Sequence, residues 1–148
     1  MPLVVIDTNV LVSAALSPRS APGQVFQAVL QRGHFAVCEQ SLAELELELV
    51  LARDKFDRFV TQRQRMALLE LVKASGVLCL IEPGHFEAAH GTCRDPDDGL
   101  FLALALAAQA RTIISGDADL LVLHPWQGIQ ICTAAQYLGR ARQAAHTV

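Results

Sequence analysis

The chain has 148 residues, of which 52% are hydrophobic and 18% are charged, and its formal net charge at pH 7 is −3. A chain of this length buries about two-thirds of its unfolded surface in one core, so we expect residues 1–148 to form a single domain. The small negative charge excludes a protein that attracts nucleic acid or anionic lipid through its overall charge. A polyanionic partner would have to meet a local basic patch or bound cations.

The cysteines indicate the compartment. Cys38, Cys79, Cys93 and Cys132 are scattered without a C-x-x-C pair, and the first residues show no signal-peptide pattern. We therefore expect a cytoplasmic protein with reduced thiols. The longest apolar stretch, at 100–110, is about half the roughly 20 residues that a membrane-spanning helix needs, which predicts a core helix and no membrane partner.

Strand-like and helical patterns alternate along the first half of the chain. They cover residues 3–7, 21–33, 35–39, 41–56 and 61–75. The run LVVID at 3–7 is typical of a strand that is buried on both faces of a parallel sheet. The run at 41–56 alternates Leu and Glu as a strand would. Its helix-forming composition and an S-x-x-E capping box of Ser41 and Glu44 nevertheless favour a helix that starts at Ser41.

The second half continues this alternation. We expect a strand at 77–82, a loop at 83–94, a helix that opens with Asp95 and Pro96, a strand at 112–115, a turn at 116–121, a strand at 129–132 and a last helix from Thr133. Strands that alternate with helices predict βαβ crossovers, which place helices on both faces of a parallel sheet. The pattern therefore predicts the α/β class, with no linker or repeat that divides the chain.

Several carboxylates lie where predicted strands end or the following helices begin. Asp7 ends the first strand, and Asp117 and Asp119 follow the strand before the turn. Asp98 lies in the first turn of the helix before that strand, and Glu46 lies in the helix after the second strand. Ligands of open α/β sheets bind outside the carboxyl ends of the strands. These five acids can therefore converge on one edge of the sheet.

Most of these acids also have a purely structural interpretation. Asp7 could begin an Asx-type turn with its neighbours. Asp98 could interact with the helix dipole or close a capping box. Asp117 and Asp119 could belong to a polar turn after a strand. The occurrence of all these acids together is stronger evidence for a functional site than any single acid.

Converging carboxylates require a neutralising partner. Two unit charges 4 Å apart repel by about 4 kcal/mol at an effective dielectric constant of 20, so several unpaired carboxylates would not stay ionised together. No Lys or Arg adjoins Asp7 or Asp117 in the sequence. An all-oxygen site favours Mg²⁺ or Mn²⁺, and hydrolysis of a phosphodiester is the reaction that suits such a site best. A bound cation would also let an acidic protein accept a polyanion.

Four segments resemble, in order and spacing, the motifs of PIN-domain ribonucleases. They are VVIDTNVLVSA, ELELVLARDKF, CRDPDDGLFLALALAAQA and IISGDADLL, and the resemblance runs from about residue 3 to residue 138. The chain looks most like the toxin components of bacterial type II toxin–antitoxin pairs. The resemblance implies a three-layer α/β/α sandwich with a short parallel sheet of four to five strands. It also implies an endoribonuclease with a Mg²⁺ or Mn²⁺ cofactor, an antitoxin protein that covers the acidic cleft, and a homodimer or higher homo-oligomer.

The resemblance also assigns roles to residues of this chain. The catalytic and metal-binding acids are implied to be Asp7, Glu46, Asp98 and Asp117. The supporting residues are implied to be Thr8, Asn9, Ser115 and Asp119. Because AELELEL permits a shift of two residues, Glu44 is an alternative to Glu46. No side chain is expected to act as a covalent nucleophile.

Two other functions fit parts of the pattern. Phosphatases with an aspartyl nucleophile also begin with Asp at the end of a first strand, but they carry a general acid two residues later, where this chain has Asn9. A non-catalytic RNA-binding or scaffold module would be marked by lost acids, and all four implied acids are present. The basic residues Arg53, Lys55, Arg58, Arg63 and Arg65 could form a rim that follows RNA phosphates or a solvated helix face.

Overall fold

The computed structural model describes residues 3–32, 34–51, 61–92 and 99–146. In this part of the chain five parallel strands form one sheet in the order β3-β2-β1-β4-β5. The strands are β1 (Val4–Ile6), β2 (Phe35–Val37), β3 (Val77–Leu78), β4 (Thr112–Ile114) and β5 (Gln130–Cys132). The α/β class and a parallel sheet of four to five strands are therefore confirmed.

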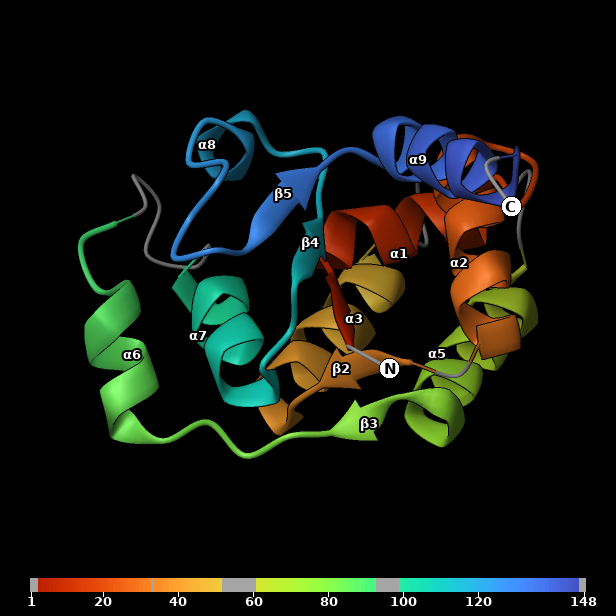
Figure 1. The fold of residues 1–148 in the computed structure, drawn as a ribbon. Helices are drawn as coiled ribbons and strands as arrows, with labels where there is room; N and C mark the ends of the chain where they lie inside the picture. The colour runs from red at the N-terminus through yellow and green to blue at the C-terminus, as the bar shows by residue number, and fades with distance from the viewer. Residues whose placement is uncertain (1–2, 33, 52–60, 93–98, 147–148) are drawn as a thin grey trace.

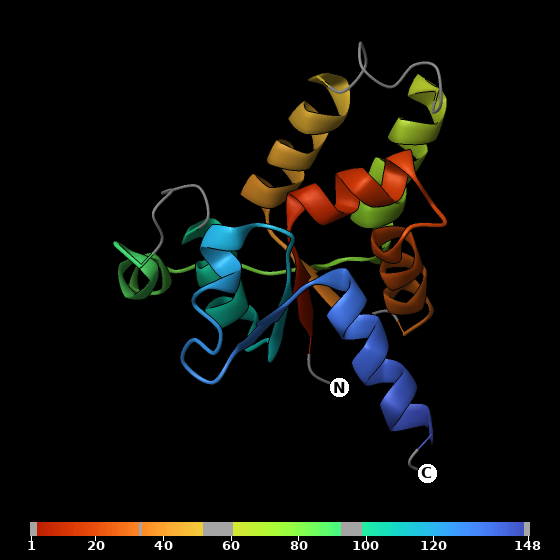
Figure 2. The same ribbon diagram turned by 90° about the horizontal axis from the view of Figure 1, so that it is seen from above.

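Helices cover both faces of the sheet (Figure 1). One face carries α1 (Thr8–Leu16), α2 (Ala21–Arg32), α3 (Glu39–Leu51), α5 (Gln62–Ser75) and α9 (Ala134–His146). The other face carries α6 (Pro83–Ala89), α7 (Gly99–Ala108) and α8 (Ala118–Leu121). Figure 2 shows the same two groups of helices with the sheet between them. The three-layer arrangement expected from the sequence is thus present.

The two faces of the sheet have separate cores because strand side chains alternate between them. Ile6, Val37 and Ile114 pack toward the helices of the first group. Val5 and Ile113 pack toward α7, whose residues Phe101, Leu102, Ala103, Leu104 and Ala105 are all buried. This confirms the core helix expected at 100–110. In the described part of the chain no helix is long and apolar enough to cross a membrane.

The order in which successive strands are added to the sheet reverses between β1 and β4. The chain runs from β1 outward through β2 to β3 and then returns to place β4 on the other side of β1. Ile6 is paired with Ile114, and the Asp7 amide donates a hydrogen bond to the Ile114 carbonyl at 2.9 Å. The residues that follow these two strands therefore lie side by side at a topological switch point, where open α/β sheets bind their ligands.

Two helix starts differ from the sequence-based expectation. Helix α1 begins at Thr8, directly after β1, although no helix was expected there. Helix α3 begins at Glu39, and the Ser41 hydroxyl bonds both backbone groups of Cys38, so the expected capping box of Ser41 with Glu44 is wrong. At both starts the first hydrogen-bonded turn depends on where the preceding strand ends.

Three other segments also differ. The strand expected at 77–82 is regular only over Val77–Leu78, and α6 occupies part of the expected loop because Pro83 suits a first helical turn. The expected turn at 116–121 contains the short helix α8. The expected helix start at Asp95 and Pro96 lies outside the described residues.

Candidate functional site

Asp7 is buried where β1 passes into α1. Only 3% of its surface is exposed, and its backbone is extended, with φ −58° and ψ 144°. One carboxylate oxygen, Oδ1, accepts a 3.4 Å hydrogen bond from the Asn9 amide, which makes Asp7 the N-cap of α1. The other oxygen, Oδ2, accepts a 2.7 Å hydrogen bond from the Ser115 hydroxyl. The strand and the helix cap together fix the position of this acid.

Ser115 connects the ends of the two central strands. Its side chain is fully buried directly after β4. Its hydroxyl donates to Asp7 and accepts a 3.0 Å hydrogen bond from the Asp117 amide. Asp117 caps α8, because its Oδ1 atom accepts a 2.9 Å hydrogen bond from the Asp119 amide. Asp7, Ser115, Asp117 and Asp119 therefore form one hydrogen-bonded network, which we call the acid network.

Burial and charge act together on Asp7. Desolvation raises the pKa of its carboxyl group above the ordinary value of 3.8. The hydrogen bonds from Ser115 and Asn9 lower this pKa, while the negative charge of Asp117 raises it further. The net direction is upward. The buried Asp7 carboxylate is thus close enough to Asp117 for the two negative charges to repel each other. A bound cation would reduce both this repulsion and the cost of desolvating Asp7.

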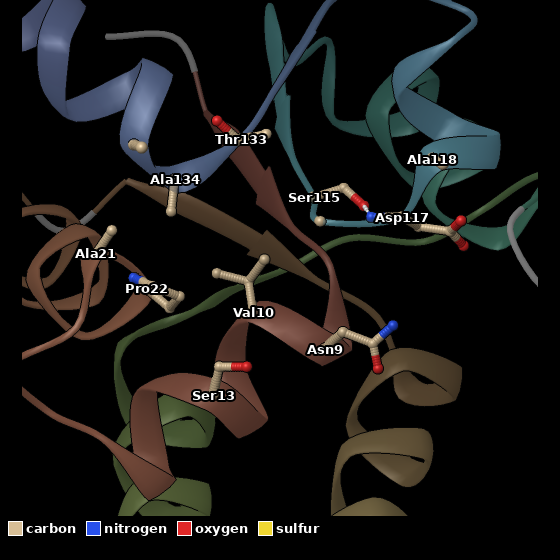
Figure 3. Close-up of a pocket in the computed structure, with 12 residues that line it drawn as sticks. Asn9, Val10, Ser13, Ala21, Pro22, Ser115, Asp117, Ala118, Thr133 and Ala134 are labelled. Atoms are coloured by element: carbon tan, nitrogen blue, oxygen red, sulfur yellow. Dashed lines mark hydrogen bonds between the residues drawn. The ribbon is translucent and has the colours of Figure 1, made fainter.

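A cavity of about 630 Å³ opens beside the acid network. Its walls come from the first turn of α1, the starts of α2 and α9, and the loop between β4 and α8. The lining residues are Asn9, Val10, Ser13, Ala21, Pro22, Ser115, Gly116, Asp117, Ala118, Thr133, Ala134 and Ala135. Figure 3 shows the Asn9 and Asp117 side chains on one side of this cavity and Ala21, Pro22 and Ala134 on the other. Among the described residues that line it, none is a Lys or an Arg.

The residues on the far wall of this cavity were not among the candidates suggested by the sequence. Ala21 and Pro22 begin α2, and Ala134 begins α9 after Thr133, whose hydroxyl accepts a hydrogen bond from the Gln136 amide at 3.1 Å. None of these residues belongs to a motif with a chemical role. The only sequence signal is that helices are expected to begin near these positions.

The remaining candidate residues that the structure describes lie outside the acid network. Thr8 is buried as the first residue of α1, and Asn9 is exposed at the cavity. Glu46 is exposed on α3, and Glu44 on the same helix is partly buried. Asp98 lies outside the described residues. Within the described ranges, no three His, Cys, Asp or Glu side chains converge closely enough to hold a metal ion.

The structural interpretations of Asp7 and Asp117 are also partly correct. Each carboxylate accepts a hydrogen bond from the backbone amide two residues later, as an Asx-type turn or a helix cap requires. A turn alone does not explain the bond between Asp7 and Ser115, which joins residues 108 positions apart. Capping and tertiary contact therefore coexist at the same carboxylate.

Both interpretations that the sequence suggested for the basic residues, a phosphate-binding rim and a solvated helix face, are wrong for Arg65. Arg65 on α5 is completely buried, so it is part neither of a phosphate-binding rim nor of a solvated face. Arg63, on the same helix, is exposed. Arg53, Lys55 and Arg58 lie outside the described residues.

The chain is similar to known proteins in sequence and in fold. Residues 3–119 match the model of the PIN domain family. The uncharacterized protein MJ1680 of Methanocaldococcus jannaschii is 30% identical over 120 residues, which cover 81% of this chain and 74% of that protein. The crystal structure of VapBC2 from Rickettsia felis bound to a DNA fragment from their promoter contains a chain with the same fold. Its TM-score is 0.60 at 14% identity, over 87% of this chain and 96% of that chain. The protein described here belongs to the PIN domain family.

Proposed function

We propose that this protein is a metal-dependent endoribonuclease that hydrolyses RNA phosphodiester bonds in the cytoplasm, and that residues 1–148 act as one domain. PIN domains are in general nucleases that act with divalent metal ions, and the chain belongs to this family. The observation that carries the proposal is the acid network. It joins Asp7 to Asp117 through Ser115 at the switch point of the sheet, and Ser115 and Asp117 line a cavity there.

The donor atoms of this network suit Mg²⁺ or Mn²⁺. Asp7 and Asp117 offer only carboxylate oxygens, which are the ligands these hard cations prefer. The raised pKa of Asp7 supports the same conclusion, because a cation would stabilise its charged form. We propose that Asp7, Glu46, Asp98 and Asp117 hold the metal ion. Glu44 is the alternative to Glu46.

The chain's own residues would orient the reacting groups. A bound Mg²⁺ or Mn²⁺ supplies an activated water and neutralises charge on the phosphate. Ser115 keeps the Asp7 carboxylate in place, because its hydroxyl is fully buried and bonds both Asp7 and Asp117. Thr8, Asn9 and Asp119 are supporting residues, since they flank the two acids in the first turns of α1 and α8.

The cavity beside the acid network suits a strand of RNA. Its volume of about 630 Å³ leaves room for part of a nucleotide chain next to Asp117. The first turns of α2 and α9 line the far wall, and the partial positive charge of helix N-termini favours an anion. With no Lys or Arg on this wall, we propose that the cation and backbone amides, rather than cationic side chains, attract the phosphates.

We further propose that the protein is the toxin of a toxin–antitoxin pair and forms a homodimer or a higher homo-oligomer. Two observations support a protein partner. The structural neighbour described as VapBC2 shares the fold over 87% of this chain. In addition, α3 exposes Leu47, Val50 and Leu51 to solvent, at 56%, 46% and 65% of their surfaces, which is typical of a surface that another chain covers.

Cleavage of a mixed pool of single-stranded RNA tests the ribonuclease proposal. The wild-type protein and Asp7→Asn, both checked for folding by circular dichroism, are incubated with Mn²⁺, with Mg²⁺ or with EDTA. We expect cleavage by the wild type that needs a metal ion and that Asp7→Asn loses. Equal cleavage by both proteins would indicate a contaminating nuclease and would overturn the proposal. Release of phosphate from a small phosphomonoester without RNA cleavage would instead support the phosphatase alternative.

A further inference from the structure

Two cysteines lie opposite each other at the end of neighbouring strands. The register of β2 and β3 pairs Val37 with Leu78, and the Cys79 amide donates a 2.7 Å hydrogen bond to the Val37 carbonyl, so the pairing continues past both strands. Val37↔Leu78 is the last pair of the regular ladder, and extending the register by one residue sets Cys38 opposite Cys79. Neighbouring strands lie about 4.8 Å apart, which falls within the usual range of Cα distances in disulfides.

The two side chains point to the same face of the sheet. Cys38 belongs to the core cluster under α7, and Cys79 packs against that same cluster. Both also line a cavity of about 390 Å³ together with residues of β3 and α6. Register, core and cavity therefore bring the two thiols to one place.

The two thiols differ in their exposure to solvent. Cys38 is buried and its sulfur accepts a 3.4 Å hydrogen bond from the Ser41 amide. Cys79 is partly exposed at the cavity, in the residue that directly follows β3. Burial raises the pKa of Cys79, and the charge of a Cys38 thiolate raises this pKa further, so the groups are within electrostatic reach. A small reagent meets Cys79 first and Cys38 second.

We propose that Cys38 and Cys79 form a redox-active pair that closes to an intrachain disulfide when a small disulfide oxidant such as glutathione disulfide is present. The Cys79 thiol loses its proton to solvent, and its thiolate attacks the oxidant, releases one glutathione thiolate and forms a mixed disulfide. Cys38 loses its proton and attacks the Cys79 sulfur, which releases the second glutathione. Two protein thiols are oxidised and one oxidant disulfide is reduced to two thiols.

The disulfide would tie the edge of the sheet to the start of a helix. Cys38 directly precedes α3, and among the described strands only β2 pairs with β3. The pair lies outside the acid network, and its oxidation does not depend on the proposed ribonuclease activity.

Peptide mapping of the full-length protein tests this pair. Reduced protein is incubated with excess glutathione disulfide at pH 8.5, remaining thiols are alkylated, and the protein is digested. Trypsin leaves Cys79 and Cys93 together in peptide 74–94, so a second protease that cuts after Glu87 must separate them. We expect loss of two of the four thiols and a linked pair of peptides that contain Cys38 and Cys79, which a reductant separates again.

Two variants make the result decisive. Cys79→Ser must abolish the linked peptides, whereas Cys93→Ser must leave them unchanged, with folding checked by circular dichroism. Glutathione that stays on Cys79 while Cys38 remains free would overturn the proposal. A bond from Cys79 to Cys93, or four thiols that survive in the folded wild type, would overturn it as well. The wild-type map alone distinguishes these outcomes if a variant does not fold.

Discussion

The hydroxyl of Ser115 donates a 2.7 Å hydrogen bond to the carboxylate of Asp7, although 108 positions separate the two residues in the chain. Both side chains are buried, and each directly follows one of the two central strands. Ser115 also accepts the Asp117 amide, so one hydroxyl fixes the relative positions of two acids. This contact is the centre of the candidate site.

Ser115→Ala is expected to weaken both metal binding and activity. It removes the donor to Asp7 and leaves the Asp117 amide without the acceptor it has now. Loss of an outer hydrogen bond to a metal ligand typically costs about 10- to 100-fold in metal affinity or activity. An unsatisfied buried group should also lower the free energy of unfolding by about 1–3 kcal/mol.

RNA cleavage rates and Mn²⁺ titration calorimetry measure the first two effects, and urea denaturation measures the third. Ser75→Ala is the matched control, because Ser75 ends α5 just before β3 and so lies at the opposite end of the strands. A Ser115→Ala protein with wild-type Mn²⁺ affinity would show that the hydroxyl does not position Asp7.

Asp7→Asn is expected to change how stability depends on pH in the metal-free protein. The pKa of Asp7 is raised in the folded state, so the folded protein retains this proton to a higher pH than the unfolded chain does. The stabilisation is therefore present at low pH and is lost as the pH rises from 3.8 through the raised pKa. Asparagine does not titrate and lacks this loss.

Urea denaturation in EDTA across this pH range checks the sign. The free energy of unfolding of the wild type should fall relative to that of Asp7→Asn as the pH rises, and Mn²⁺ should restore part of it in the wild type only. Identical pH profiles for the two proteins would contradict a raised pKa for Asp7.

Glu46→Gln is expected to reduce RNA cleavage by at least about tenfold, while Glu48→Gln leaves it unchanged. Both residues are exposed on α3 and both substitutions remove the same charge, so the comparison isolates a specific role. Glu44→Gln completes the set and decides between the two candidate glutamates. Loss of cleavage in Glu44→Gln with activity retained in Glu46→Gln would reassign the second acid to Glu44.

The same substitution at two helical glycines should have opposite effects on stability. A Cβ atom on Gly23 in α2 would clash with the backbone of Pro18, and backbone cannot move aside cheaply. Gly23→Ala should therefore destabilise the protein by about 1–3 kcal/mol. A Cβ atom on Gly139 in α9 meets nothing within 4 Å, so Gly139→Ala should stabilise the helix by about 0.5–1 kcal/mol.

Thermal unfolding of both variants measures these effects. Gly23 lies one residue beyond Pro22, which lines the cavity, so a stable and undisturbed Gly23→Ala protein would show that the start of α2 packs less tightly than described. A loss of stability in Gly139→Ala would contradict the open surroundings of that position.

Much of this fold could be predicted from local pattern. The β-branched run before Asp7 and the helical run of α7 are each determined by the residues within them, and the resemblance of four motifs correctly identified the PIN domain family. The start of α3 at Glu39 could not be predicted in this way. Ser41 caps the helix from its third residue, because the Cys38 amide donates to the Ser41 hydroxyl and the Ser41 amide donates to the Cys38 sulfur. The helix therefore begins directly after Cys38, where β2 has ended.

The sequence by itself determined which chemical groups this protein has: carboxylates after buried strands, a hydroxyl two residues before Asp117, and no cation beside Asp7. Only the tertiary structure decided which of them meet. The order of the strands placed β4 beside β1, which joined Ser115 to Asp7. It also placed β3 beside β2, which set Cys79 opposite Cys38 although the two appear unrelated in the sequence. Strand register is a contact between distant segments, and it depends on the packing of the whole sheet.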